Sequence, residues 1–194
     1  MKRKKVELYD MSDLFALAAE NDHRIELRGD VWLSHIRDGH YLLREGYQGK
    51  NILPTEGLNH VLDVICHGSS QVTTWYCGIF KGNYTPIATD TAADNLGAGG
   101  DFTECQDADY DDPATNRPAY TEAAAAAGVI TNSANPASFT IAASITVYGA
   151  FLASSQAKTA ASGTLLAAKK FDASRAVIDN DVLLITYQIT ATSS

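Results

Sequence analysis

The feature that most constrains the fold is a series of short, strand-like runs from residue 69 onward. The runs at 73–80, 138–141, 144–148 and 182–190 are rich in Val, Ile, Thr and aromatic residues, which favour strands. Several of them alternate apolar with polar side chains, as half-buried strands do. Turn-forming Gly, Asn, Asp, Ser and Pro residues separate the runs. Short strands with clear turns and little helical periodicity predict a mainly β fold, a β-sandwich or jelly roll.

The first 50 residues differ in character from the rest of the chain. They mix charged and apolar residues and contain three strand-like runs, at 24–28, 31–36 and 41–44. Gly-Asp and Asp-Gly pairs separate these runs, and Asp-Gly is a strong hairpin signal. We therefore predict two parts: an N-terminal arm over 1–50, made of a short helix and β-hairpins, and a β-sandwich domain over 51–194.

Two helices are predicted from the spacing of apolar residues. The first covers 13–20 and follows Ser12, a good N-cap. Its apolar residues share one face, which gives the helix a side to bury: Leu14, Leu17 and Ala18, with Phe15 beside them. The second helix covers 56–66. It carries a stripe at i, i+3, i+4, i+7 spacing that we expect to lie in the core: Leu58, Val61, Leu62 and Ile65.

The stretch 88–114 is long for a loop in a compact domain, and such loops usually serve binding. A short helix is expected within it near 91–96. Residues 101–112 contain six carboxylates, and the Asp-x-Asp-x-Asp spacing at 107–111 could offer oxygen ligands to calcium. The spacing lacks the glycine and the distal Glu of an EF-hand loop. A solvated or partner-facing acidic loop is therefore preferred to a metal site, which stays open as the alternative.

No catalytic motif is visible in the sequence. Cys66, Cys77 and Cys105 cannot all pair within one chain, and we interpret them as reduced thiols. Their spacing does not match a paired-cysteine zinc motif. Neither a Gly-x-Ser-x-Gly turn nor a His-Glu-x-x-His helix occurs. We therefore expect no enzymatic activity, no metal and no cofactor.

Charge is distributed unevenly along the chain. Residues 1–50 hold nine basic and nine acidic side chains, whereas the remainder holds six basic and fourteen acidic ones, which accounts for the net charge of −8. An acidic body argues against direct nucleic-acid binding, because affinity for phosphate comes mainly from Lys and Arg. No run approaches the ~18 apolar residues that cross a bilayer, and no apolar run follows the basic start. Neither membrane association nor secretion is expected.

A helix followed by a Trp-bearing strand, at 51–64 and 69–80, is one of several recognisable segments. Others are turn-and-strand pairs at 117–120, 132–141 and 147–152. Together these segments resemble small virion structural proteins of tailed bacteriophages. The resemblance covers residues 48–192, about three quarters of the chain.

The resemblance implies a capsid decoration or cement protein that binds the exterior of the major capsid protein lattice and stabilises the head. It implies a small homo-oligomer, a dimer in preference to a trimer, which is assembled in the host cytoplasm and located on the outer surface of the virion. Basic, apolar and aromatic side chains outside the expected core are the candidate partner contacts: Lys2, Arg3, Lys4, Lys5, Leu14, Phe15, Tyr47 and Tyr110. The alternatives are a fibre, spike or adsorption module that binds a host glycan, and a head–tail or tail structural component.

Overall fold

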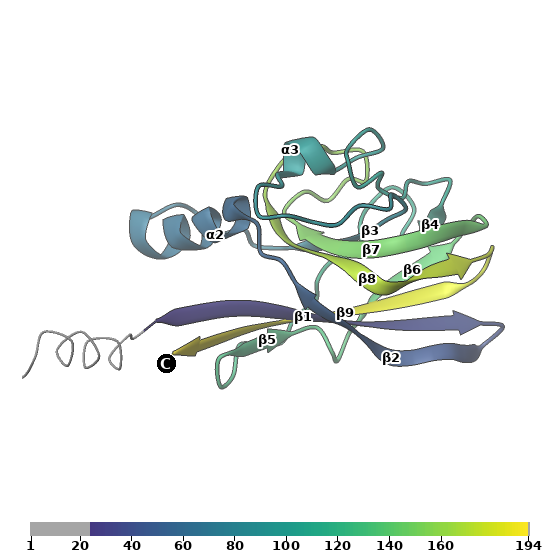
Figure 1. The fold of residues 1–194 in the computed structure, drawn as a ribbon, viewed down its shortest axis with the longest axis horizontal. Coiled ribbons are helices and arrows are strands. Elements are labelled where there is room, and N and C mark those ends of the chain that lie inside the picture. Colours follow the sequence, from purple (N-terminus) through teal and green to yellow (C-terminus); the bar gives the residue numbers. More distant parts are fainter. Residues whose placement is uncertain (1–23, 194) are drawn as a thin grey trace, which may run out of the picture.

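The computed structural model describes residues 24–193, which form two antiparallel sheets (Figure 1). The larger sheet has the order β2-β1-β9-β6-β4, and β5 also pairs with β9. Its strands are β1 Ile25–Arg37, β2 His40–Asn51, β4 Tyr110–Asp112, β5 Val129–Thr131, β6 Ala137–Ile141 and β9 Val182–Ser193. The smaller sheet has the order β3-β7-β8, with β3 Tyr76–Phe80, β7 Ile145–Ala153 and β8 Leu165–Val177. The prediction of a mainly β, sandwich-like fold is confirmed.

The core lies between the two sheets and follows the two-residue period of the strands. On β9, Leu183, Ile185 and Tyr187 are fully buried, whereas the intervening residues are half-exposed. A second apolar cluster lies beneath the loops of the smaller sheet, where the rings of Phe80 and Phe102 stack with centroids 4.8 Å apart. The alternation of β9 also defines a solvent-facing side of the larger sheet.

Strand β1 makes the N-terminal region part of the sandwich. It pairs with β9 from Ile25↔Ser193 to Ile36↔Val182. Within the expected N-terminal arm, β1 and β2 form an antiparallel hairpin, and both strands belong to the larger sheet together with strands that follow residue 51. The two runs expected at 24–28 and 31–36 form one strand through Gly29. A Cβ at Gly29 would lie 2.1 Å from Asn51 Oδ1, so this glycine permits close packing rather than marking a turn.

Helix α2 spans Thr55–Leu62 and continues into a π-helical turn, η1, at Asp63–His67. Helix α3 spans Ala92–Asn95, and its N-cap residue Thr91 accepts a hydrogen bond from the Asp94 backbone N–H at 3.2 Å. Both helices were expected from the sequence and both are confirmed. Within residues 24–193, none of the helices is long and apolar enough to cross a membrane.

The apolar stripe of α2 is only partly in the core, contrary to expectation. Val61 packs against the core, whereas the side chains of Leu62 and Ile65 are 58% and 73% exposed. The helix projects from the sandwich body (Figure 1). Its buried residue Gly57 closely approaches β8. A Cβ at Gly57 would lie 2.6 Å from the Leu166 carbonyl oxygen on β8. Helical spacing identifies an apolar face, but it does not say whether another element lies opposite that face.

Candidate interaction surfaces

The solvent-facing side of the larger sheet carries a hollow of about 430 Å³. It collects the residues of β1 and β9 that alternate with the buried ones, together with residues of β2 and of the segment between β5 and β6. We call this lining the outer face: Trp32, Ser34, Tyr41, Glu45, Thr131, Ser133, Pro136, Leu184, Thr186 and Gln188. The mixture of rings, hydroxyls and amides suits recognition of a polar partner that also has apolar surface.

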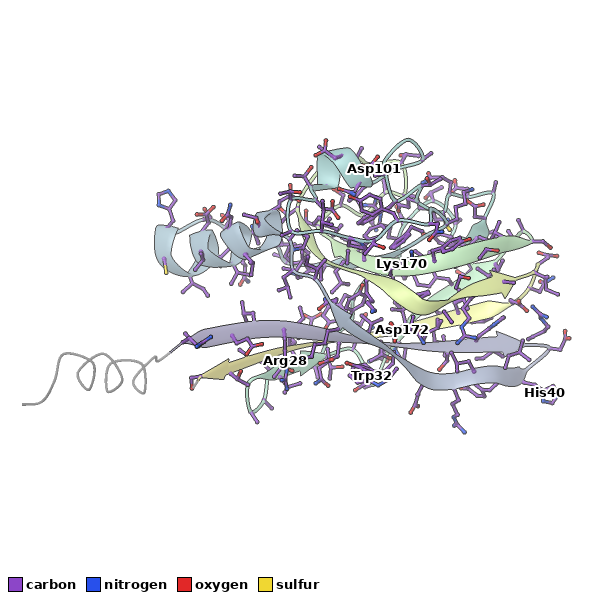
Figure 2. The ribbon with its side chains drawn as sticks, in the orientation of Figure 1. Arg28, Trp32, His40, Asp101, Lys170 and Asp172 are labelled. Carbon is purple, nitrogen blue, oxygen red and sulfur yellow. The ribbon has the colours of Figure 1, made fainter. Side chains whose placement is uncertain are left out.

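Aromatic side chains concentrate at the β2 side of the outer face. Trp32 and Tyr47 are cross-strand partners, and their ring centroids are 5.5 Å apart. Figure 2 shows Trp32 on the side of the larger sheet that faces away from the smaller sheet. The Tyr47 hydroxyl donates a hydrogen bond to Asp30 Oδ1 at 2.7 Å, and this bond raises the pKa of Tyr47 above its ordinary value. The phenol therefore stays neutral and its ring is held in place.

Strand β2 is the edge of the larger sheet. Tyr41, Leu42 and Tyr47 on this strand are 48%, 56% and 51% exposed. An edge strand presents unpaired backbone N–H and C=O groups, which can pair with a strand of another chain. Exposed rings beside such an edge add apolar area to that contact. We call these three residues and the adjacent backbone the β2 edge.

A second hollow, of about 300 Å³, lies between α2/η1 and the ends of β1 and β9. Nine of its eleven lining residues are apolar. We call it the apolar groove: Leu27, Leu53, His60, Val61, Val64, Ile65, Gln71, Val72, Trp75, Leu166 and Ile189. The imidazole of His60 stands edge-on to the indole of Trp75, with centroids 5.5 Å apart. The groove exposes apolar surface to solvent, which is typical of a binding site for another apolar segment.

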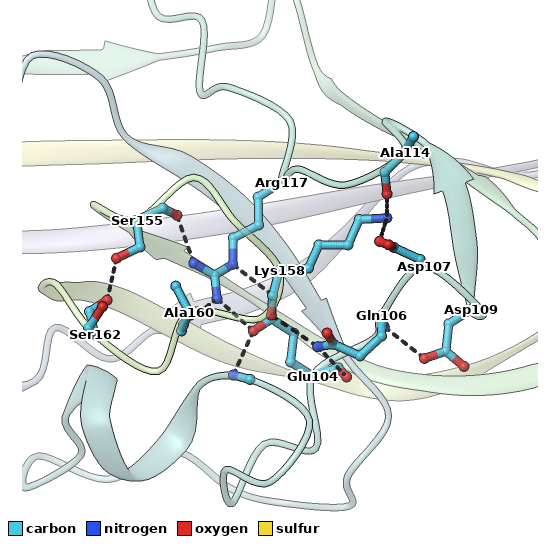
Figure 3. A network of polar contacts seen from close by, with 11 residues as sticks. Glu104, Gln106, Asp107, Asp109, Ala114, Arg117, Ser155, Lys158, Ala160 and Ser162 are labelled. Carbon is cyan, nitrogen blue, oxygen red and sulfur yellow. Dashed lines mark hydrogen bonds and ion pairs between the residues drawn. The ribbon is translucent and has the colours of Figure 1, made fainter.

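The long loop is attached to the body by a buried ion pair, shown in Figure 3. Arg117 Nε and Nη2 each donate to a Glu104 carboxylate oxygen at 2.7 Å, and both side chains are fully buried. The remaining Arg117 donors reach the carbonyl oxygens of Ser155 and Ala160 at 2.7 and 3.0 Å. Burial raises the pKa of Glu104, and the adjacent Arg117 opposes that rise. The pair connects three loops and has the contacts of a structural clamp.

A buried lysine adds to this clamp. Lys158 Nζ donates to the backbone carbonyl oxygens of Tyr110 and Ala114, and it lies 3.1 Å from Asp107 Oδ1 (Figure 3). It also lies 3.5 Å from the centroid of the Tyr110 ring, a cation–π contact. Burial lowers the pKa of Lys158, while Asp107 acts in the opposite direction.

Three of the six carboxylates in residues 101–112 are engaged in separate ion pairs. Glu104 pairs with Arg117, Asp107 with Lys158, and Asp109 with Lys81 at 2.7 Å; the three acids therefore have separate cationic partners. Across the part of the chain that the structure describes, no three His, Cys, Asp or Glu side chains are placed to hold a metal ion.

The predicted contact residues have different outcomes. Six of them lie outside the described residues: Lys2, Arg3, Lys4, Lys5, Leu14 and Phe15. Tyr47 is exposed on the β2 edge. Tyr110 is fully buried, and its ring meets Phe139 edge-on at 5.1 Å. The expectation that Tyr110 contacts a partner is therefore corrected, because strand β4 directs its ring into the core.

Sequence reasoning missed Trp32, Tyr41 and the groove. The alternation of Trp32 and Ser34 with the apolar Val31 and Leu33 could have indicated an outward-facing tryptophan. The groove had no comparable signal, because it joins residues 53–75 with residues of β1, β8 and β9 that are far away in the sequence. Its existence depends on the position of α2 relative to the sheet rather than on any local pattern.

Comparisons with known proteins do not identify relatives. No protein-family model matches the chain, and no curated protein matches it. Functional inference therefore rests on the surfaces described above and on the resemblance noted from the sequence.

Proposed function

We propose that this chain is a non-enzymatic cement protein of a tailed-phage capsid, which binds the exterior of the major capsid protein lattice and stabilises the head. The β2 edge is the observation that carries the proposal. It combines an unpaired strand edge with three exposed apolar or aromatic side chains, Tyr41, Leu42 and Tyr47. This combination fits attachment to another folded subunit.

The rest of the described molecule agrees with a structural role. The buried charged groups around the long loop have partners within the chain, and they hold loops together. A rigid sandwich that binds through the β2 edge can cover the junction between capsid subunits without catalytic groups. On a lattice, repeated weak contacts gain avidity, particularly if the cement protein is itself a dimer, as we also propose.

The first test is the number of copies in the particle. Quantitative mass spectrometry of purified virions should give a ratio of this chain to the major capsid protein that is near one or a simple fraction. A few copies per particle would contradict lattice-wide cement and move the chain to a vertex, neck or tail. Absence from the particle would overturn the proposal.

The second test is directed at the contact surface. Tyr41→Ser combined with Leu42→Ser should weaken binding to capsids that lack the protein, because it removes exposed apolar area beside the strand edge. Co-sedimentation with such capsids measures the loss. Ile87→Ser is the matched control, since Ile87 is 51% exposed and lies outside the sheets. The adjacent Thr85 and Pro86 share a hollow with Lys50 and Asn51, at the opposite end of β2 from Tyr41 and Leu42. Equal binding by the double variant and the control would contradict a role for the β2 edge.

The hollow on the outer face favours one second candidate, a virion adsorption module that binds a host glycan. Trp32 and Tyr41 offer ring surfaces for the apolar faces of sugars, and Ser34, Thr186 and Gln188 offer hydrogen-bonding groups. A glycan array with the purified chain tests this candidate. Binding that is lost in Trp32→Ala but kept in Ile87→Ser would favour adsorption over cement.

A further inference from the structure

The apolar groove is lined by strands on one side and by a helix on the other. Leu27 and Ile189 of the paired strands β1 and β9 line one side, and Val61, Val64 and Ile65 of α2/η1 line the other. Leu53, Leu166 and Trp75 are also part of the lining. Figure 1 shows the helix and the two strands extending in the same direction from the sandwich.

Strongly exposed apolar side chains lie in the groove and beside it. Ile65, which lines the groove, is 73% exposed, and Ile25, two positions before the lining residue Leu27 on β1, is 79% exposed. Exposed apolar side chains of this kind gain free energy when another apolar group covers them. The described residues do not supply such a group.

The chain itself provides a segment of suitable character at this position. Residues 1–23 lie outside the described residues and join the body directly before β1. Within them, 12–20 comprises the N-cap candidate Ser12 and the helix expected over 13–20, whose apolar residues, among them Leu14 and Leu17, share one face. Only residues 21–24 separate this segment from Ile25, and four extended residues span at most about 14 Å.

The lengths also match. The combined helix α2/η1 has eight and five residues, which corresponds to a wall about 20 Å long at a rise of ~1.5 Å per residue. The eight residues of the expected helix would extend about 12 Å. The segment therefore fits along the wall without passing its end.

We propose that residues 12–20 of this chain occupy the apolar groove, with Leu14 and Leu17 packed between α2/η1 and the ends of β1 and β9. The short connection gives the chain's own segment a high effective concentration at the groove, which favours it over the same segment of a second copy. The proposal is independent of the capsid function, because it concerns only packing within one chain.

Trp75 makes the groove directly observable. The chain has two tryptophans, so Trp32→Phe leaves Trp75 as the sole indole reporter in the groove. In this background, Leu14→Ser combined with Leu17→Ser should shift Trp75 emission to longer wavelength and increase its quenching by acrylamide. The expected cause is entry of water and quencher into the vacated groove.

The matched control changes polar residues of the same segment, Asp13→Ser combined with Glu20→Ser, and should leave emission and quenching as in the parent. Circular dichroism confirms that each variant keeps the β-sheet spectrum. From the other side of the contact, Val64→Ser should reproduce the effect of the Leu14/Leu17 variant. Unchanged quenching in both apolar variants would overturn the proposal. Protection of Trp75 that disappears on dilution to the monomer would also overturn it and would assign the groove to a second copy.

Discussion

Arg117 determines how the long loop is held at the level of single residues. Its guanidinium is fully buried, and its contacts reach Glu104, Ser155 and Ala160. A buried ion pair of this kind adds little when compared with an apolar substitute, but loss of one partner leaves an uncompensated charge in the interior. The stabilising effect of Arg117 therefore depends on the presence of Glu104, and that of Glu104 depends on Arg117.

We predict that Arg117→Met lowers the free energy of unfolding by about 3–5 kcal/mol, because Glu104 then stays buried without a cation. Urea denaturation followed by fluorescence measures the loss. Adding Glu104→Gln to the same chain should recover part of it. Lys169→Met is the control: Lys169 pairs with the 64%-exposed Asp172, and its loss should cost at most about 1 kcal/mol. Similar costs for both single variants would contradict the clamp.

Asp181 makes the free energy of unfolding depend on pH. Its carboxylate accepts hydrogen bonds from Arg37, from His35 and from the Ile178 backbone N–H at 2.7–2.9 Å. The bonds from Arg37 are the main reason why the pKa of Asp181 lies well below its ordinary value of 3.8. Because folding favours the charged form, this contribution to stability is complete above that ordinary pKa and is lost as the pH falls below it.

Asp181→Asn should therefore reduce stability at pH 7 and flatten the decline in the free energy of unfolding below about pH 4. Thermal unfolding at a series of pH values measures both effects. Asp179→Asn, a change at a neighbouring exposed aspartate, is the control and should keep the shape of the parent profile. An unchanged acid limb in Asp181→Asn would show that other carboxylates dominate acid unfolding.

At the scale of elements, the attachment of α2 depends on the absence of a side chain. Gly57→Ala places a Cβ where the Leu166 carbonyl oxygen lies only 2.6 Å away, and a backbone atom cannot move aside cheaply. We predict a loss of about 1–3 kcal/mol as the helix is displaced from β8. Thermal unfolding measures it, and Asn59→Ala on the exposed side of α2 should cost much less. An unchanged or higher stability of Gly57→Ala would indicate that the greater helix propensity of alanine, rather than close approach, governs this position.

The elements also show how far the sequence could be interpreted. Alternation on β9 and the period of α2 were local signals, and they predicted these elements correctly. The pairing of β1 with β9 and the burial of Tyr110 depend on which distant strands meet, and local patterns carry no such information. The interaction surfaces follow the same division: Tyr47 was found as an exposed aromatic, whereas the groove required the placement of α2.

At the scale of the whole molecule, the position of β1 between β2 and β9 means that two truncations should have different outcomes. Removal of residues 1–22 should leave a folded sandwich, because all strands of the larger sheet remain. It should also weaken capsid binding if the basic tip of the proposed cement protein contacts a neighbouring subunit.

Removal of residues 1–50 should prevent folding, because β9 then loses its longest partner. Circular dichroism and the dispersion of amide NMR signals separate these outcomes; a folded 51–194 fragment would support the boundary expected from the sequence.

The pairing of β1 with β9 also has a consequence for synthesis on the ribosome. His35 of β1 forms a hydrogen bond with Asp181, directly before β9, and these two residues are 146 positions apart. The strand that completes the larger sheet is therefore translated after all the other described strands, and until then the edge of β1 opposite β2 has no partner. The smaller sheet, whose three strands are all translated before β9, can assemble first. Newly made chains are consequently most vulnerable to mispairing in the interval before β9 arrives, when crowded neighbours could offer β1 a substitute strand.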